Sequence, residues 1–354
     1  MKARDSPELR IMLGDWIKKK PSEDISCARA ANTDRPLRAA DPGRAERAES
    51  HEDTVQSFST GNQRTVLRTR KENIPCPRMP GARVAVVTGS NKGIGLAIVR
   101  ALCKQFEGDV YLTARDPKLG EEAVKKLQQE GLRACFHQLD INNLESIRAL
   151  RDFLKATYGG LDVLINNAGI AFKEADTTPF DIQADITLKT NYFATRDACH
   201  ELLPLIKAHG RVVNVSSIVS SMALAGCSPA LQETFRSTTI TEEELDKLMQ
   251  KFVEDTKKGI HKEEGWANTA YGVSKIGVTV LSRIQAREMQ KERKGDGILL
   301  NACCPGFVQT DMAGSSMPKT PDQGAETPVY LALLPPDAKE PYGQLVSEKA
   351  VKEW

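Results

Sequence analysis

Long hydrophobic runs are absent from this sequence. None of its apolar stretches approaches the roughly 20 residues that a membrane-spanning helix needs, so we expect no transmembrane segment and no membrane partner. The N-terminus also lacks the apolar core of a secretory signal. These two absences argue against an exported or membrane-inserted protein.

Neither sign of charge is in clear excess. The chain has 49 Lys and Arg against 47 Asp and Glu, a net charge of +2, so no bulk field attracts nucleic acid. Its eight cysteines show no metal-ligand spacing, and we expect no metal site. In a chain without an export signal, cysteines are expected to be reduced. We therefore expect a cytoplasmic protein.

The first 78 residues have few aromatic side chains. Only Trp16 and Phe58 occur there, and no sustained period of 2 or 3.6 residues appears. Such a segment cannot bury enough apolar area to offset its ordering entropy. We expect residues 1–78 to be a disordered extension, with a short helix near 7–19, and residues 79–354 to form the folded domain. Met79 stands directly before that domain, so the extension is interpreted as an alternative or mispredicted N-terminus.

Regular structure is predicted from residue 83 onward, as buried apolar strands that alternate with amphipathic helices. Strands are predicted at 83–88, 110–114, 135–139, 161–166, 211–215 and 298–302. Helices are predicted at 94–106, 118–130, 143–157, 181–207 and 269–292. This alternation is typical of an α/β fold, a doubly wound parallel sheet of the Rossmann type with helices on both faces.

One region departs from this alternation. Segments 229–236 and 241–258 both have helical periodicity, although a single crossover would need only one helix. Thr241 is a predicted N-cap, with Glu244 completing a capping box. We therefore predict a helical insertion over residues 229–258, just before the last long helix.

A glycine-rich turn joins the first predicted strand to the first predicted helix. It reads Thr88-Gly89-Ser90-Asn91-Lys92-Gly93-Ile94-Gly95. Glycines let the backbone approach a pyrophosphate, whose charge the free N–H groups and the helix dipole stabilise. The spacing G-x-x-x-G-x-G differs from the common G-x-G-x-x-G, and a flexible turn would also use glycines. Its place at the first strand–helix junction nevertheless predicts a dinucleotide site.

The end of the second predicted strand bears on the choice of cofactor. An acidic residue there would bind the ribose 2′-hydroxyl of NAD, whereas an arginine favours the 2′-phosphate of NADP. Arg115 follows the strand, and Lys92 in the glycine turn adds a second cation. Asp116 could still contact a ribose, and Arg115 could be an ordinary surface charge. The two cations favour NADPH.

The last long helix carries the candidate catalytic pair. Tyr271 and Lys275 are four residues apart and share a helix face. A nearby ammonium lowers the pKa of a phenol, which is about 10 in water, so Tyr271 would exchange a proton near neutral pH. This pattern is common by chance. Three further features make the Tyr-Lys pair specific. Ser217 stands at the end of a predicted strand, and Asn166-Asn167-Ala168-Gly169 follows another. Asn191, a poor helix former, lies inside a predicted helix.

These motifs occur in the order found in the short-chain dehydrogenase/reductases, which residues 82–354 resemble. The motifs are Thr88-Gly89-x-x-x-Gly93-x-Gly95, Asn166-Asn167-Ala168-Gly169, Ser217, Tyr271-x-x-x-Lys275 and Pro305-Gly306. Longer stretches resemble the mammalian-type monomeric NADPH-dependent carbonyl reductases of that family, at residues 91–99, 252–258, 301–306 and 326–330.

The resemblance implies a role for each catalytic residue. Tyr271 would protonate the carbonyl oxygen while the nicotinamide delivers hydride. Lys275 would lower the pKa of Tyr271 and bind the nicotinamide ribose. Ser217 would hold the carbonyl, and Asn191 would position a water that links Lys275 to solvent.

The resemblance also implies two binding sites. NADPH would contact Gly89, Asn91, Lys92, Gly93, Ile94, Gly95, Arg115, Asp140, Ile141, Asn167, Tyr271, Lys275, Val308, Gln309 and Thr310. Carbonyl reductases also bind glutathione and its adducts beside the active site. By position, the substrate and glutathione residues would be Ser217, Phe172, Lys173, Glu174, Gln183, Ala270 and Phe307.

Two positions depart from the sequence pattern of the carbonyl reductases, and a third has an open role. Leu119 stands where close relatives usually have a second arginine, which softens the expected preference for NADPH. Phe307 replaces a usual tryptophan and leaves substrate preference open. Cys304 would lie near the cofactor, either as a reactive thiol or as an inert buried one.

The activity implied is NADPH-dependent reduction of aldehydes, ketones and quinones, including xenobiotic and prostaglandin-type carbonyls. One alternative is an oxidative dehydrogenase of steroid or prostaglandin alcohols, which would use the same residues. Another is a non-catalytic cofactor-binding sensor or scaffold, which loss of Tyr271 or Lys275 would indicate, but both are present. The predicted insertion would cover the apolar face that family members use between subunits, so we expect a monomer.

Overall fold

The computed structural model describes residues 81–173 and 175–354. The predicted disordered extension 1–78, its short helix and the candidate substrate residue Glu174 lie outside the described residues.

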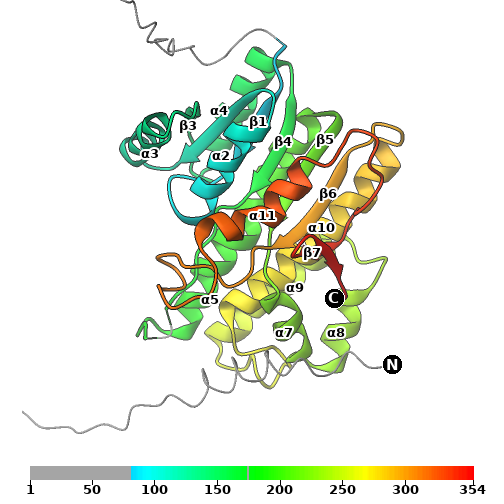
Figure 1. Cartoon of the computed structure of the whole chain (residues 1–354). Coiled ribbons are helices and arrows are strands. Elements are labelled where there is room, and N and C mark those ends of the chain that lie inside the picture. The colour runs from blue at the N-terminus through cyan, green and yellow to red at the C-terminus, as the bar shows by residue number, and fades with distance from the viewer. Residues whose placement is uncertain (1–80, 174) are drawn as a thin grey trace, which may run out of the picture. The chain divides into compact units, whose positions relative to one another are not determined.

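A single sheet forms the centre of the described domain, with strand order β3-β2-β1-β4-β5-β6-β7-β8 (Figure 1). The paired strands from β3 to β7 run parallel, and β8 pairs antiparallel with β7. The strands are β1 (Val84–Val87), β2 (Asp109–Ala114), β3 (Cys135–Gln138), β4 (Leu161–Asn166), β5 (Ile206–Val215), β6 (Leu299–Cys304), β7 (Leu345–Ser347) and β8 (Ala350–Lys352).

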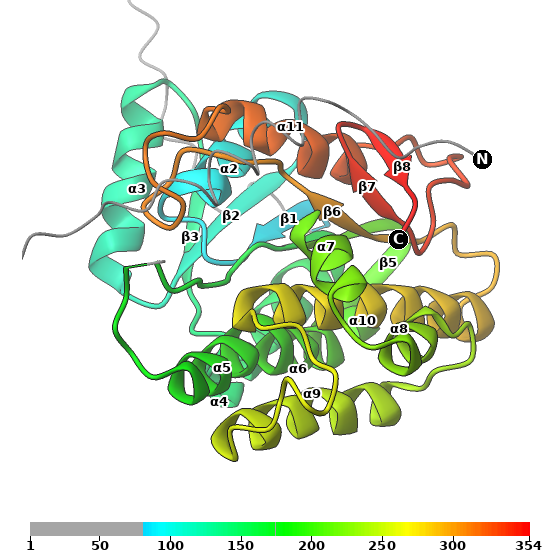
Figure 2. The ribbon, with the colours of Figure 1, turned by 90° about the horizontal axis from the view of Figure 1, so that it is seen from below.

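Helices cover both faces of this sheet (Figure 2). One face carries α2 (Gly93–Gln105), α3 (Pro117–Gln129) and α11 (Pro321–Ala332). The other carries α4 (Leu144–Tyr158), α5 (Phe180–Leu188), α6 (Ala194–Leu202) and α10 (Ala270–Glu292). The central strands are apolar and buried because both of their faces are covered. The predicted doubly wound Rossmann-like fold is confirmed.

A third apolar cluster lies beneath the two helices that we predicted as an insertion. They are α8 (Pro229–Arg236) and α9 (Glu242–Lys257). The predicted capping box of Thr241 and Glu244 is present at the start of α9. Phe252 of α9 is fully buried in this cluster, in T-shaped contact with Trp266. Helix α9 thereby packs against α5 and α10, so α10 has few exposed positions.

The chain between α5 and β5 differs from the predicted helix 181–207. It contains a π-helical turn, η1 (Lys189–Phe193), and a 3-10 turn, η2 (Leu203–Leu205), and the strand already begins at Ile206. Four further elements were not predicted. Helix α7 (Val219–Ala225), like β7 and β8, is too short to show a period, and α11 contains Pro328.

Cysteine chemistry agrees only in part with expectation. Cys103, Cys199, Cys227, Cys303 and Cys304 are free thiols. Cys135 is disulfide-bonded, so the expectation of reduced thiols was wrong for this residue. Among the described residues, no helix combines the length and the apolar character needed to cross a membrane.

Arg211 is the largest side chain buried in the sheet, with 2% of its surface exposed. Its guanidinium donates hydrogen bonds to main-chain carbonyls at His209, Gly210, Gly297, Leu334 and Pro335. These carbonyls belong to the start of β5, the turn before β6 and the segment after α11. One cation therefore satisfies polar groups from three parts of the chain that would otherwise be buried without partners.

We predict that Arg211→Met lowers the free energy of unfolding by about 3 kcal/mol, because it keeps the apolar stem but leaves buried carbonyls without a donor. Urea unfolding followed by circular dichroism measures this loss. Arg236→Met, at an exposed arginine of α8, is the control. Equal losses in the two variants would contradict the role of Arg211.

Candidate active site

The glycine-rich turn is held against the end of β4. Gly89 and Gly93 have φ angles of +58° and +57°, which favour glycine. Asn167 donates from Nδ2 to the carbonyls of Thr88 and Gly89, at 3.0 Å each. A Cβ at Gly95 would lie 2.6 Å from that Nδ2, so a larger residue does not fit. The other predicted members of the turn, Asn91, Lys92 and Ile94, lie between these glycines.

The segment after β6 lies beside this turn. It carries the predicted cofactor residues 308–310, and a Cβ at Gly93 would be 3.4 Å from Cγ2 of Thr310. Lys92 forms an exposed ion pair with Asp311, with 2.8 Å between Nζ and Oδ2. The structure thus brings two sequence-distant parts of the predicted cofactor site together, and adds an acidic partner for Lys92 that the sequence did not indicate.

The predicted adenine and ribose-phosphate residues lie at the carboxyl ends of β2 and β3. Arg115 is exposed directly after β2 and forms no ion pair with any residue in the described ranges. Asp116 caps α3 and accepts hydrogen bonds from two backbone amides, so its carboxylate is already engaged. Asp140 accepts from the amide of Asn142, and Ile141 is buried beside it. The exposed Arg115 suits the 2′-phosphate of NADP, whereas the carboxylate of Asp116, already bonded to backbone amides, is poorly placed to bind the 2′-hydroxyl of NAD.

Helix α10 positions the predicted catalytic pair against the end of β5. Thr269 caps the helix by accepting a hydrogen bond from the amide of Gly272. Lys275 is 5% exposed, and its Nζ donates to the carbonyl of Val215 at 2.7 Å. The same Nζ lies 5.6 Å from the ring centroid of Tyr271. The strand end and the helix are therefore joined through the lysine.

Asn191 lies in the π-helical turn η1, and such turns are frequent at functional sites. Its Oδ1 accepts from the amide of Ile170 at 2.8 Å, and its Nδ2 donates to the Ile170 carbonyl at 2.9 Å. Nδ2 also donates to Oγ of Ser274 at 3.0 Å. A Cβ at Gly169 would lie 3.1 Å from Oδ1 of Asn191 and 3.7 Å from Nζ of Lys275. Asn191 therefore joins the strand-end loop to α10 and lies near the lysine.

Ser217 follows β5 and completes the group of four. Its Oγ accepts from the amide of Val219 at 3.2 Å, and its side chain lowers the pKa of the Tyr271 phenol. The four predicted catalytic residues thus come from η1, the end of β5 and the first turns of α10, and they meet at the carboxyl edge of the sheet. Ser274 and the Val215 carbonyl were not predicted, because an interior serine and a backbone group carry no sequence signal.

The two titrating groups of the site have shifted pKa values. Burial raises the pKa of Tyr271 to about 12, with a further rise from Cys304 and an opposing effect of the hydrogen bond from Ser217. Burial lowers the pKa of Lys275 to about 8. The net shift of the Tyr271 pKa is upward because burial outweighs the effect of Ser217, and the lowering by Lys275 stays a prediction. Cys304 is a buried thiol whose Sγ accepts from the amide of Gly306.

The predicted substrate residues come from four segments: the loop after β4, α5, the start of α10 and the segment after β6. Phe172 and Lys173 follow the loop that Asn191 holds, and Lys173 is exposed. Gln183 donates from Nε2 to the carbonyl of Thr178 within the start of α5. Ala270 is buried at the start of α10. Phe307 is 42% exposed, so its ring is available for contact with a ligand.

The sequence matches the family model of the short chain dehydrogenases over residues 83–229 and 259–321. This match covers more than half of the chain, and the protein therefore belongs to the short-chain dehydrogenase family. The match leaves out residues 230–258, which contain most of α8 and all of α9.

Within this family, the sequence is similar to proteins named as carbonyl reductases. Human Carbonyl reductase (NADPH) 1 is 70% identical over 274 residues, which are 77% of this chain and 99% of that protein. Carbonyl reductase (NADPH) 3 of Rattus norvegicus is 65% identical over 273 residues, again 77% of this chain and 99% of that protein. Among solved structures, salutaridine reductase from Papaver somniferum has a TM-score of 0.67 at 32% identity, covering 74% of this chain and 99% of that one.

The lowered pKa of Lys275 predicts a pH-dependent contribution to stability. Its ordinary pKa is 10.5, so between about pH 8 and pH 10 the unfolded chain binds more protons at this residue than the folded protein. The unfolding free energy of the wild type, relative to Lys275→Met, should therefore rise by up to about 3 kcal/mol from about pH 7 to about pH 10. Urea unfolding of both proteins at each pH measures it. A difference that stays constant with pH would contradict a buried, depressed lysine.

Proposed function

We propose that this protein reduces aldehydes, ketones and quinones to alcohols or hydroquinones, with NADPH as the hydride donor. The observation that carries the proposal is the convergence of Tyr271, Lys275, Ser217 and Asn191 at the carboxyl edge of the sheet. Ligands of open α/β folds bind at this edge. The identity of 65–70% to proteins named as NADPH carbonyl reductases supports the same reaction.

The residues present fit the cofactor. Gly89 and Gly95 pack too closely against Ala168 and Asn167 to carry side chains, and this packing fixes the glycine turn at the N-terminus of α2. Backbone amides at a helix N-terminus would hold a pyrophosphate there. Arg115 and Lys92 are the exposed cations for a 2′-phosphate, and Asp140 and Ile141 flank the adenine position. Bound NADPH supplies the hydride, and the residues of the chain hold and protonate the carbonyl.

Tyr271 is the proton donor in this mechanism. With a pKa of about 12, its phenol is protonated at neutral pH and available to a substrate oxygen. Ser217, whose side chain acts on the same phenol, orients the carbonyl. As the proton leaves Oη, the ammonium of Lys275 stabilises the phenolate that forms. Asn191 holds the loop beside the lysine and positions the water through which the proton is replaced.

The named relatives support reduction over oxidation. An oxidative dehydrogenase of steroid or prostaglandin alcohols would use the same residues, because proton and hydride transfer at this site are reversible. The identity of 65–70% to proteins named as NADPH carbonyl reductases favours the reductive direction. A non-catalytic scaffold would not need Tyr271, Lys275, Ser217 and Asn191 together at the carboxyl edge of the sheet.

Further assignments belong to this proposal. Residues 79–354 form the catalytic domain, 229–258 its insertion and 1–78 an extension. The protein is cytoplasmic. It is a monomer, because α9 buries Leu245, Met249 and Phe252 over the helices α5 and α10. Glutathione adducts bind beside the substrate, along Phe172, Lys173, Glu174, Gln183 and Ala270, with Phe307 as an apolar contact.

We predict that Tyr271→Phe lowers the rate of NADPH consumption with menadione by about 100- to 10,000-fold, which is the usual contribution of a general acid. NADPH affinity, followed by cofactor fluorescence, should change little because the ring remains. The matched control is Tyr330→Phe, at a tyrosine of α11 that is 37% exposed, and its rate should stay near the wild-type value. Equal rates for wild type and Tyr271→Phe would refute the assigned mechanism.

A further inference from the structure

Trp354, two residues after β8, lies against the helix that follows Ser217. Its indole Nε1 donates a hydrogen bond to Oγ of Ser220 in α7 at 3.0 Å, and Ser220 has no exposed surface. The indole ring is partly buried and packs on the third apolar cluster. The reduction mechanism described above uses neither Trp354 nor Ser220, although both lie close to a catalytic residue.

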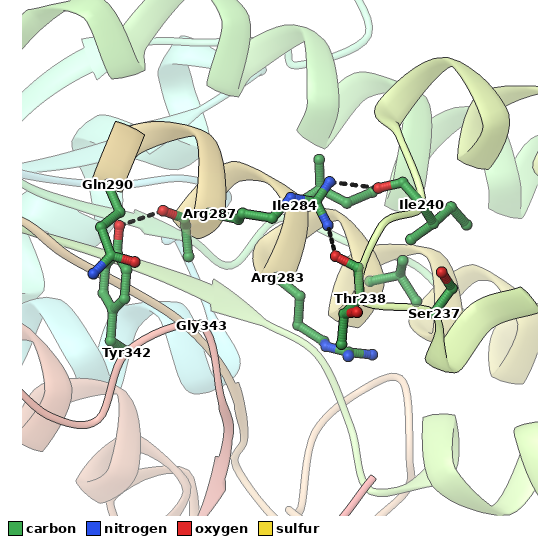
Figure 3. Close-up of a pocket in the computed structure, with 11 residues that line it drawn as sticks. Ser237, Thr238, Ile240, Arg283, Ile284, Arg287, Gln290, Tyr342 and Gly343 are labelled. Atoms are coloured by element: carbon green, nitrogen blue, oxygen red, sulfur yellow. Dashed lines mark hydrogen bonds between the residues drawn. The ribbon is translucent and has the colours of Figure 1, made fainter. Parts of the chain in front are cut away.

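A second contact of the indole is with Arg283 of α10. The guanidinium carbon of Arg283 lies over the ring, 5.5 Å from its centroid, which is a cation–π geometry. Figure 3 shows Arg283 beside Ser237 and Thr238, in the link between α8 and α9. Its guanidinium donates to two carbonyls at the end of α8, at 3.3 Å each. The indole is therefore held on α7 by a hydrogen bond and on α10 by a cation that is itself fixed.

Helix α7 connects this indole to the active site. It has only seven residues, too few to be stable without tertiary contacts. It follows Ser217 closely, and the amide of Ser220 donates to the Ser217 carbonyl at 3.0 Å. A Cβ at Gly272 would lie 2.6 Å from Cβ of Ala223, so α7 packs tightly on α10 next to Tyr271. A displacement of α7 would therefore move Ser217 relative to Tyr271.

Ser220 is also connected to the segment that holds the catalytic lysine. Oγ1 of Thr279 lies 3.3 Å from Oγ of Ser220 and 2.9 Å from the carbonyl oxygen of Lys275. Oγ of Ser216 lies 2.7 Å from the same Thr279 hydroxyl. All three hydroxyl side chains are buried. An indole N–H can only donate, so Ser220 accepts from Trp354, and this fixes one end of the buried hydrogen-bonded set.

We propose that Trp354 is a positioning residue for the reduction, which fixes α7 through Ser220 and so holds Ser217 beside Tyr271. Trp354 acts through these residues and not on the reacting atoms. Its effect falls on the chemical step, because the hydrogen-bonded set contains no residue of the glycine turn or of 308–310. The inference rests on the proposed function, in which Ser217 orients the carbonyl.

The first test is Trp354→Phe, which keeps an aromatic ring but removes the N–H donor. With menadione as substrate, kcat should fall about tenfold, within the roughly 100-fold that a misplacement of about 1 Å can cost. The Kd for NADPH, measured by cofactor fluorescence, should not change. Val351→Ala, at an exposed position of β8, is the control and should keep kcat within about twofold of wild type.

A double-mutant cycle with Ser217→Ala separates positioning from a general loss of stability. If Trp354 acts through Ser217, Trp354→Phe should lower kcat no further in the Ser217→Ala background. Three results would each overturn the proposal: an unchanged kcat in Trp354→Phe, the same fold-change in both backgrounds, or a loss of NADPH affinity as large as the loss of kcat.

Amide hydrogen exchange of the full chain provides a measurement that needs no activity. The Ser220 amide should exchange at least about tenfold faster in Trp354→Phe than in wild type, because α7 is held less firmly. Amides of β1 should exchange at the wild-type rate. Unchanged exchange at Ser220 would contradict the hold of Trp354 on α7. A wild-type protein that consumed no NADPH, together with faster Ser220 exchange in the variant, would refute the proposed function and support the positioning of α7.

Discussion

The buried hydrogen bond from Lys275 to the Val215 carbonyl is the contact on which the active site depends. It joins the end of a central strand to the catalytic helix, at 2.7 Å and nearly out of contact with water. Ser216, the next residue of the chain, bonds to Thr279 and to the Lys275 carbonyl, and so ties the strand end to the same helix again. Because the helix is fixed at this point, the position of Tyr271 one turn earlier is fixed as well. Burial also separates the pKa values of the pair, which keeps the phenol protonated and weakens the hold of the lysine on its proton.

Much of the fold was predictable from the sequence because both faces of the sheet are covered. Strands buried on two sides must be continuous apolar runs, and β1 and β4 show this clearly. The elements that escaped prediction are those whose stability comes from tertiary contacts. Helix α7 has only seven residues, and the π-helical turn at Asn191 depends on partners in a distant loop. The candidate site was predictable as a set of residues, since glycine, tyrosine and lysine spacing is local. The direction of the Tyr271 pKa shift was not, because burial is a property of the assembled structure.

Helix α10 joins the proposed active site to the region around α8 and α9. The first half of α10 carries Tyr271 and Lys275, and its second half holds the α8–α9 link through Arg283 and Arg287. The family match omits residues 230–258, whereas the curated relatives align over nearly their whole length. The apolar cluster around Phe252 and Trp266 then explains why these helices pack firmly on α5 and α10.

The central claim is that the site presents a protonated phenol to its substrate at neutral pH. Carbon-13 NMR of the unliganded protein, labelled at Cζ of tyrosine, measures the protonation state of each phenol directly. The signal of Tyr271 is assigned as the one that is missing from the spectrum of Tyr271→Phe. The account predicts the chemical shift of a neutral phenol for Tyr271 from about pH 6 to about pH 10, as a raised pKa requires. A Tyr271 signal that titrates to the phenolate below about pH 8 would contradict it.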